Sequence, residues 1–292
     1  MTEIKSQILS QVIQQRSQIS HKGNYGHILL IGGSVNYGGA IIMATEGAIN
    51  AGSGLICVAT HSLNLAALHA RDPEAMFLDW RDRHLSSWIT KVDVIVCGPG
   101  LGTDDFAKHL LKTVCTAVTA KQTLVLDASA LDLIGNDPSL LQKTTADRVI
   151  LTPHQMEWQR LSRIRIPFQS DSANQNALNQ LLPNGNGILV LKSHRTHLYD
   201  QHQHVLINPL GNPGMATGGT GDTLSGIIGS FCGQFGNSLQ SVAAAVYLHS
   251  MAADLIFKTD YVVRPTKLSA CLPKLMKENE NQEIGKNDSD RT

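Results

Sequence analysis

The stretch NPLGNPGMATGGTGDTLSGIIGSF, residues 208–231, crowds glycines ahead of one acidic residue, Asp222, and an apolar run. Glycine inside a regular element is destabilising by roughly 0.5–1 kcal/mol relative to alanine, so such a cluster usually has a local reason. A tight turn is one such reason. A row of bare backbone N–H groups at a helix start, ready to bind phosphate, is another. The rest of the chain decides between the two.

The glycine loop 218–222 matches neither common phosphate-binding fingerprint. It lacks the lysine of GxxxxGK[ST], and it lacks the spacing and early position of GxGxxG. Three features still favour a function. The predicted helix after the loop offers unpaired N–H groups and a partial positive charge. Asp222 lies where that dipole keeps a carboxylate ionised. The loop also follows the predicted hairpin late in the chain, where it could form an additional side of a ligand-binding pocket. An N-cap is the structural alternative for Asp222, and one residue can serve both purposes.

Composition restricts the class of protein and of partner. The chain has 292 residues, 42% of them hydrophobic, and a net charge of +0, so we expect no nucleic-acid partner and no anionic membrane surface. Any polyanion it binds should be small and held in a pocket. The cysteines are odd in number and form no CxxC pair, which predicts free thiols in a reducing cytoplasm. No apolar run of 18 residues and no signal-peptide pattern is seen, so we expect a soluble cytoplasmic protein.

Short β-branched runs alternate with helical patterns along the first two thirds of the chain. Apolar on nearly every residue, these runs are typical of strands covered on both faces of a parallel sheet. The alternation predicts an α/β fold with a central, mostly parallel sheet and helices on both faces. Residues 191–209 then predict a hairpin, followed by helices over 223–232 and 239–255. The predicted strands are 28–31, 55–58, 92–96, 124–126, 149–151 and 188–191.

The residues that follow these strands indicate a site. Ligands of open α/β sheets bind beyond the carboxyl ends of the strands. The first predicted strand runs into GGSVNYGG, the third into CGPGLGT and the fourth into DASAL. The fifth runs into TPHQMEW and the sixth into KSHRT. Glycine loops and single polar side chains should therefore meet at one edge of the sheet.

The motifs together resemble a known family. NPGMATGGTGDTLSG is similar to the signature of the ribokinase-like superfamily, whose GxGD aspartate is a base beside an anion hole. With KGNYGHILLIGGS, CGPGLG, LDASAL and LTPHQMEW in the same order, the chain resembles the ADP/ATP-dependent NAD(P)H-hydrate dehydratase family from about residue 22 to 255. The resemblance implies a ribokinase-like fold, Mg²⁺ as cofactor, and ADP or ATP as co-substrate.

Carried over by position, the resemblance assigns roles to residues of this sequence. It makes Asp222 the catalytic base and a substrate contact, and it makes Gly219 and Gly221 nucleotide contacts. The other substrate contacts would be Ala40, Gly100 and His154. The remaining nucleotide contacts would be Lys192, Ser193, His194, Arg195 and Thr196. Two segments depart from the family pattern. TPHxGE reads TPHQME, with Met156 in place of glycine, and KGxxT reads KSHRT.

Other polar residues carry weaker interpretations. Glu157 could help to hold Mg²⁺ through water, or it could simply be a helix-start carboxylate. Asp127 could close the substrate pocket or cap the next helix. Lys22 could lie on the substrate side before the first strand, or it could be an ordinary solvated lysine. No protein metal site is expected, because the histidines at 194, 197, 202 and 204 lack a matching acidic or thiol partner.

The reaction implied by the resemblance is the repair of hydrated NADH or NADPH. The 6-hydroxyl of the hydrate is phosphorylated, and loss of that phosphate restores the double bond. An aspartate with an ordinary pKa near 4 is a weak base but a sufficient one. Two alternatives stay open: a small-molecule kinase of the hydroxyethylthiazole or pyridoxine type, and a nucleotide-binding regulator without chemistry.

The same resemblance implies partners and domain organisation. We expect one domain over residues 1–276 and a disordered tail over 277–292, which is low in apolar residues. The family often carries an N-terminal epimerase domain. The short segment before Lys22 leaves no room for one, so a separate epimerase is expected. The family also implies a homo-oligomer, commonly a tetramer.

Overall fold

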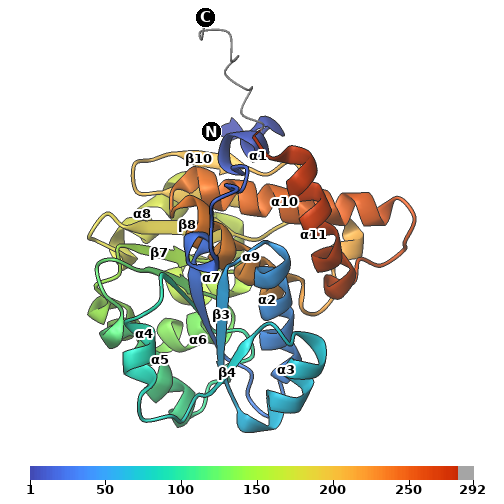
Figure 1. The fold of residues 1–292 in the computed structure, drawn as a ribbon. Coiled ribbons are helices and arrows are strands. Elements are labelled where there is room, and N and C mark those ends of the chain that lie inside the picture. The colour runs from blue at the N-terminus through green and yellow to red at the C-terminus, as the bar shows by residue number, and fades with distance from the viewer. Residues whose placement is uncertain (282–292) are drawn as a thin grey trace, which may run out of the picture.

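Ten strands form one sheet in the computed structural model, which describes residues 1–281 (Figure 1). The strand order is β1-β10-β9-β8-β7-β6-β5-β2-β3-β4. Strands β8 to β4 along this order are all parallel, whereas β9 is antiparallel to β8 and to β10. The strands are β1 Thr2–Glu3, β2 His27–Ile31, β3 Leu55–Thr60, β4 Met76–Asp79, β5 Val94–Cys97, β6 Thr123–Leu126, β7 Arg148–Leu151, β8 Gly187–Leu191, β9 His197–Asp200 and β10 Val205–Ile207.

Helices cover both faces of the sheet. One face is packed by α1 Gln7–Val12, α2 Gly38–Asn50, α9 Thr220–Phe235, α10 Leu239–Phe257 and α11 Pro265–Asn279. The other is packed by α4 Leu85–Ile89, α5 Asp105–Ala117, α6 Ser129–Asn136, α7 Gln155–Ser162 and α8 Asp171–Leu181. The short helix α3 Leu65–Arg71 follows β3 and contributes Leu68 to the first face. This arrangement confirms the predicted fold class.

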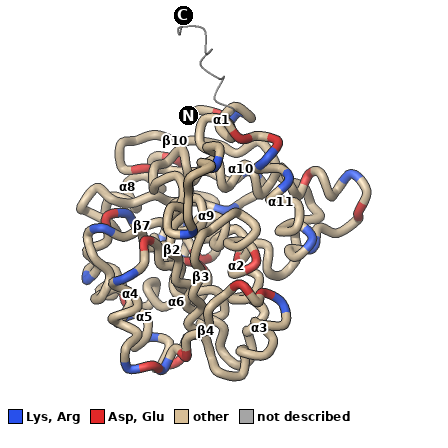
Figure 2. Tube along the Cα trace, in the orientation of Figure 1, with Lys and Arg blue, Asp and Glu red and all other residues tan. Residues whose placement is uncertain are grey.

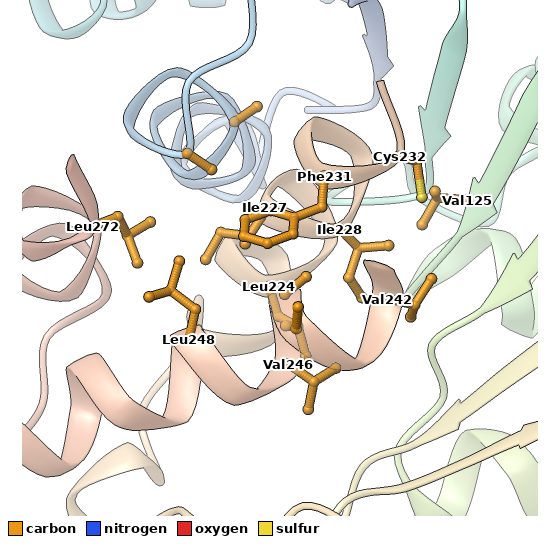
Figure 3. Packing of buried hydrophobic residues seen from close by; sticks show 14 of the residues in the cluster. Val125, Leu224, Ile227, Ile228, Phe231, Cys232, Val242, Val246, Leu248 and Leu272 are labelled. Atoms are coloured by element: carbon orange, nitrogen blue, oxygen red, sulfur yellow. The ribbon is translucent and has the colours of Figure 1, made fainter. Parts of the chain in front are cut away.

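Alternate residues of each central strand serve the two faces. In β2, Ile28 and Leu30 pack with the α9 side, while Leu29 and Ile31 pack with the α5 side. All four are fully buried, which explains why the strand reads as an unbroken apolar run. Figure 3 shows apolar side chains of α9 and α10 filling the space between these two helices. Basic and acidic residues are interspersed along the chain trace (Figure 2), in keeping with the zero net charge.

All six strands predicted from the sequence are present, with ends shifted by at most two residues. The hairpin is also present, as β9 and β10. The sequence analysis missed β4, an edge strand that pairs with β3 alone, and the two-residue β1. Both have exposed or half-buried positions, so they lack the continuous apolar run on which the prediction depended.

The last helices differ from the prediction at their ends. Helix α9 begins at Thr220 rather than 223, inside the glycine loop. Helix α11 continues to Asn279, so residues 277–279 are helical and not part of a disordered tail. Its apolar residues Leu272 and Leu275 pack into the first face and carry the helix past the predicted boundary. Residues 282–292, the rest of the predicted tail, lie outside the described residues.

Helix α10 is long and apolar enough to cross a membrane by length and composition. It is a core helix of the fold instead, because 78% of that window is buried against its neighbours. Four of the five cysteines are buried and Cys271 is partly exposed, and all five are free thiols.

Candidate active site

The loops after five neighbouring parallel strands converge at the carboxyl edge of the sheet. Lys192 follows β8, and it pairs through a parallel bridge with His154, which follows β7. Asp127 follows β6, and the glycine loops that begin at Gly98 and Gly32 follow β5 and β2. The sequence prediction that these segments meet at one edge is confirmed.

The glycine loop bends the chain into α9 and places Asp222 in the first helical turn. Gly219 is the N-cap, with a φ of 94° that favours glycine. Asp222 is the third residue of the helix and makes no capping hydrogen bond, so its interpretation as an N-cap is wrong. A Cβ on Gly221 would lie 3.1 Å from the Nζ atom of Lys192. The missing side chain therefore lets the Lys192 ammonium approach the start of α9.

Lys192 is the cationic centre of the site. Its Nζ atom donates to Oδ1 of Asp127 at 2.8 Å, and the Asp127 side chain is 1% exposed. Burial opposes the charge of this ammonium, yet the carboxylates of Asp127, Glu157 and Asp222 raise its pKa above the ordinary lysine value. Lys192 therefore stays charged at neutral pH. Asp127 is its buried counterion and not a helix cap, because the cap of α6 is Ala128.

The two other carboxylates of the site hold protons more tightly than usual. Burial and the charge of Asp127 raise the pKa of Asp222 to about 6, against the opposing effect of Lys192. Burial likewise raises the pKa of Glu157 to about 7, which Lys192 opposes. The prediction of an ordinary pKa near 4 for Asp222 did not include this burial. A base with a pKa near 6 is still ionised at neutral pH and accepts a proton more readily.

His154 caps helix α7. Its Nδ1 atom accepts hydrogen bonds from the N–H groups of Met156 at 3.1 Å and Glu157 at 3.2 Å. In return the Glu157 carboxylate accepts from the N–H of His154 at 2.8 Å. Burial and the charge of Lys192 lower the pKa of His154, so its Nε2 atom carries the only ring proton at neutral pH. The ring is half-exposed, its Nε2 atom lies 3.4 Å from Oε1 of Glu157, and its Nδ1 atom is not free to act as a base.

Ala40 and Gly100 lie against each other where the β2 and β5 loops meet. The N–H of Ser34 donates to the carbonyl of Gly100 at 2.6 Å, and a Cβ on Gly100 would come within 3.0 Å of the Ala40 methyl. The same Cβ would be 2.3 Å from the Tyr37 carbonyl, and Gly100 has a φ of 62°. Only glycine fits this corner, so the two backbones can approach closely. The substrate roles of Ala40, Gly100 and His154 stay predictions.

A cavity of about 450 Å³ opens between the β8–β9 turn, the glycine loop and α10. Its walls include five of the predicted nucleotide contacts: Lys192, Ser193, His194, Thr196 and Gly221. Arg195 does not line it, and its guanidinium lies 4.0 Å from the Glu3 carboxylate. Gly219 packs against Met43, because a Cβ at this position would be 2.2 Å from the Met43 sulfur. Nucleotide contact by Arg195 and Gly219 stays a prediction.

Two features of the site escaped the sequence analysis. Helix α10 supplies Val246, His249 and Ser250 to the cavity, although its sequence reads as an ordinary apolar helix. The pairing of Asp127 with Lys192 joins residues 65 positions apart, and no local sequence pattern predicts it.

Lys22 was predicted on the substrate side. That prediction is wrong, because Lys22 precedes the amino end of β2 and its carbonyl lies beside Gly54 ahead of β3.

Two of the four histidines at 194, 197, 202 and 204 do have an acidic partner, so the prediction that these histidines lack one is wrong. His197 lies 3.3 Å from Asp171, and His204 lies 2.8 Å from Asp200. Within residues 1–281, no group of three or more His, Cys, Asp or Glu side chains is placed to hold a metal ion.

A sequence model described as NAD(P)H-hydrate dehydratase matches residues 28–274. The chain belongs to this family. A relative from Lactiplantibacillus plantarum, named ADP-dependent (S)-NAD(P)H-hydrate dehydratase, is 48% identical over 278 residues, which cover 94% of this chain and 97% of the relative. The resemblance found in the sequence motifs is thereby confirmed.

Solved structures of the NAD(P)H-hydrate dehydratase family and its superfamily share the fold. A ribokinase-like superfamily protein from Enterococcus faecalis has a TM-score of 0.92 and 45% identity, covering 96% of this chain and 97% of that one. An ADP/ATP-dependent NAD(P)H-hydrate dehydratase from Bacillus subtilis, co-crystallised with ATP and Mg²⁺, has a TM-score of 0.82 and 27% identity, covering 96% and 99%. The fold is therefore ribokinase-like, as the sequence predicted.

Proposed function

We propose that this protein dehydrates the (S) form of hydrated NADH or NADPH at the expense of ADP. One observation carries the proposal. Asp222 follows Gly221 in the first turn of α9, and Gly221 lines the nucleotide cavity beside Lys192. A cation therefore lines a cavity large enough for part of a nucleotide, and the base is the residue that follows its glycine wall. The donor and the epimer follow the printed name of the L. plantarum relative.

The first step is phosphoryl transfer to the 6-hydroxyl of the hydrate. The hydroxyl oxygen forms a bond to the terminal phosphorus of ADP, the bond from that phosphorus to the departing AMP oxygen breaks, and the hydroxyl proton passes to Asp222. Such transfers have a loose transition state, so the protein mainly positions groups and neutralises charge. The N–H groups at the start of α9 and the ammonium of Lys192 are placed for that task.

The second step is loss of the phosphate. The bond between C6 and oxygen breaks as the ring nitrogen lone pair moves toward C6, and a proton then leaves C5 to give the double bond of the dihydronicotinamide. Inorganic phosphate and AMP are the other products. A phosphate ester is a far better leaving group than hydroxide, which is why the dehydration consumes a nucleotide.

Asp127 is a positioning residue in this scheme. Its carboxylate is 1% exposed and accepts from Lys192 at 2.8 Å, so it fixes the ammonium between the cavity and Asp222. A buried charge left without a partner is strongly destabilising, typically by about 3–5 kcal/mol, so the pair holds its geometry when the phosphates are absent.

The residues present fit Mg²⁺ as a cofactor. Magnesium keeps several waters and needs only one or two carboxylates. The carboxylate of Glu157 is buried near Lys192 with its Oε2 atom held by the His154 N–H. Glu157 would hold the ion through water. When bound, the ion would offset the negative charge of the donor phosphates.

Further partners complete the proposal. An enzyme limited to the (S) hydrate leaves the (R) form unused. We therefore expect a separate epimerase that converts the (R) hydrate into the (S) hydrate. We also propose a homotetramer working in the cytoplasm with adenine nucleotide and hydrated dinucleotide as its small-molecule partners. Sedimentation velocity of the purified protein tests the tetramer directly, because a monomer of 31.6 kDa would sediment far more slowly.

The decisive experiment incubates the protein with chemically hydrated NADH, Mg²⁺ and either ADP or ATP. The expected result is a return of the absorbance band of reduced nicotinamide, with release of one phosphate and one AMP for each NADH formed from ADP. A stable phosphorylated product without that band would indicate a small-molecule kinase. Nucleotide binding without any product would indicate a regulator. Either outcome would refute the proposal.

A further inference from the structure

His249 is a buried histidine at the nucleotide cavity that the proposed chemistry does not use. It lies on α10 with 3% of its surface exposed, and it lines the cavity beside Thr220 and Gly221. Its Nε2 atom is 3.2 Å from the carbonyl oxygen of Thr220, the first residue of α9. The ring therefore links the core helix to the helix that carries Asp222.

This contact settles which nitrogen carries the proton. Burial lowers the pKa of His249 to about 4, and the nearby charge of Lys192 acts in the same direction, although the Thr220 carbonyl opposes them. The ring is thus neutral at pH 7, with one nitrogen donating and the other accepting. A carbonyl oxygen can only accept, so Nε2 carries the proton. Nδ1 is left as a bare acceptor.

The accepting nitrogen faces the cavity. Among residues 1–281, Nδ1 of His249 has no hydrogen-bond partner, yet it is not one of the unpartnered polar atoms sealed from solvent. Because the side chain is almost wholly enclosed and lines the cavity, the accessible surface of Nδ1 must open into that space. The wall around it includes the apolar side chains of Leu210, Leu224 and Val246.

The lining of the cavity offers groups that suit both the phosphates and the base of a nucleotide. Lys192 and the start of α9 supply the positive charge that phosphates need. The neutral wall of α10 offers apolar surface and one acceptor, which suits a base. A nucleobase with an amino group would donate a hydrogen bond to Nδ1. A nucleobase with a carbonyl group at the same place would leave two acceptors facing each other without a hydrogen bond.

We propose that Nδ1 of His249 accepts a hydrogen bond from the 6-amino group of adenine and so selects 6-aminopurine over 6-oxopurine nucleotides as phosphate donors. The inference rests on the proposed use of an adenine nucleotide. It goes beyond that function by naming the residue that reads the base. His249 acts as a specificity-determining residue, and its bond to Thr220 keeps its tautomer fixed.

The test compares ADP with inosine diphosphate, which carries an oxo group at position 6. Calorimetry of both nucleotides is run on the wild type and on His249→Phe, which keeps an aromatic ring and removes both nitrogens. Leaving a buried polar group unpaired costs about 1–3 kcal/mol, so the wild type should prefer ADP by roughly 5- to 150-fold. The variant should bind the two nucleotides within about 2-fold of each other, within the error of such a comparison.

Two further variants separate recognition from structure. Val242→Ala opens a cavity on the same helix, away from the nucleotide, so it should lower stability and leave the ADP preference unchanged. His249→Leu removes both ring nitrogens in a smaller apolar side chain, so its preference should also fall. It serves if the phenylalanine variant does not fold.

The outcomes distinguish this inference from the proposed function. An ADP preference that persists in both His249 variants would overturn the inference even if the protein dehydrates hydrated NADH. Loss of the preference in a protein that shows no dehydration would support the inference and remove the proposed function.

Discussion

At the scale of single residues, the ammonium of Lys192 interacts with the carboxylates of three acidic residues. Lys192 is bonded to Asp127, and the charges of Glu157 and Asp222 also raise its pKa. Of the four groups, Asp222 alone follows the glycine loop in the first turn of a helix. It is therefore the carboxylate that we propose as the base.

Asp222→Asn should keep the fold and nucleotide binding and lose most of the turnover. The amide has the same shape as the carboxylate but cannot accept the hydroxyl proton. General-base catalysis contributes about 10²–10⁴-fold, so kcat should fall by that factor. Asp105→Asn is the control, because Asp105 also lies in the first turn of a helix, α5, but its carboxylate is exposed and it is far from the site in sequence. Near-normal turnover in Asp222→Asn would remove Asp222 from the role of base.

The charges around Asp222 predict how activity depends on pH. Its pKa of about 6 makes kcat/KM fall as the pH drops below about 6, because the base becomes protonated. Asp127 raises that pKa and Lys192 lowers it. Asp127→Asn should therefore move the acid limb of the profile to lower pH, and Lys192→Met should move it to higher pH. Shifts in the same direction in both variants would mean that another group limits the rate at low pH.

The glycine loop and α9 act together at the scale of elements. The sequence analysis placed the functional aspartate correctly but started its helix three residues late, because glycines are poor helix formers by propensity. Packing of α9 against α2 and the sheet overrides that propensity. The glycines Gly226 and Gly229 of α9 allow this, since a Cβ would lie 1.9 Å from the Ala44 carbonyl and 2.6 Å from Val96 respectively.

Adjacent glycines of the loop should respond differently to alanine. Gly219→Ala forces an alanine into a φ of 94° and against the sulfur of Met43, which should cost about 1–3 kcal/mol and displace Asp222. Gly218→Ala is the control, because its added methyl meets nothing within 4 Å. Thermal unfolding and kcat measured on both variants check this. Equal losses in the two would show that flexibility of the loop, and not this one conformation, is what function requires.

The limit of the sequence analysis also lies at the scale of elements. Strands buried on both faces and loops with unusual glycine content stand out in one dimension, and both were found. The wall of the nucleotide cavity that α10 supplies was not found, because His249 is one polar residue in an apolar helix. The ion pair of Asp127 and Lys192 was missed because strands β6 and β8 become neighbours of β7 only in the folded sheet.

One sheet separates two apolar layers at the scale of the whole molecule. Phe231 of α9 is fully buried in the layer formed by α1, α2, α9, α10 and α11 (Figure 3). All three tryptophans lie in the other layer or pack against it: Trp80, Trp88 and Trp158. Tryptophan fluorescence therefore reports on one layer only, whereas circular dichroism reports on both.

Phe231→Ala should lower the stability of both layers together. Deleting a fully buried phenylalanine side chain costs about 3–5 kcal/mol, and Phe168→Ala should cost no more than about 0.5 kcal/mol because that ring is 67% exposed. Each central strand contributes alternate residues to the two layers, so neither layer can unfold while the sheet remains. The fluorescence midpoint in urea should thus fall in Phe231→Ala as far as the circular dichroism midpoint does, although every tryptophan lies across the sheet from the substitution. A fluorescence midpoint that stays at the wild-type value would show that the sheet does not couple the layers, and that the site at its edge can lose α9 while the rest of the protein stays folded.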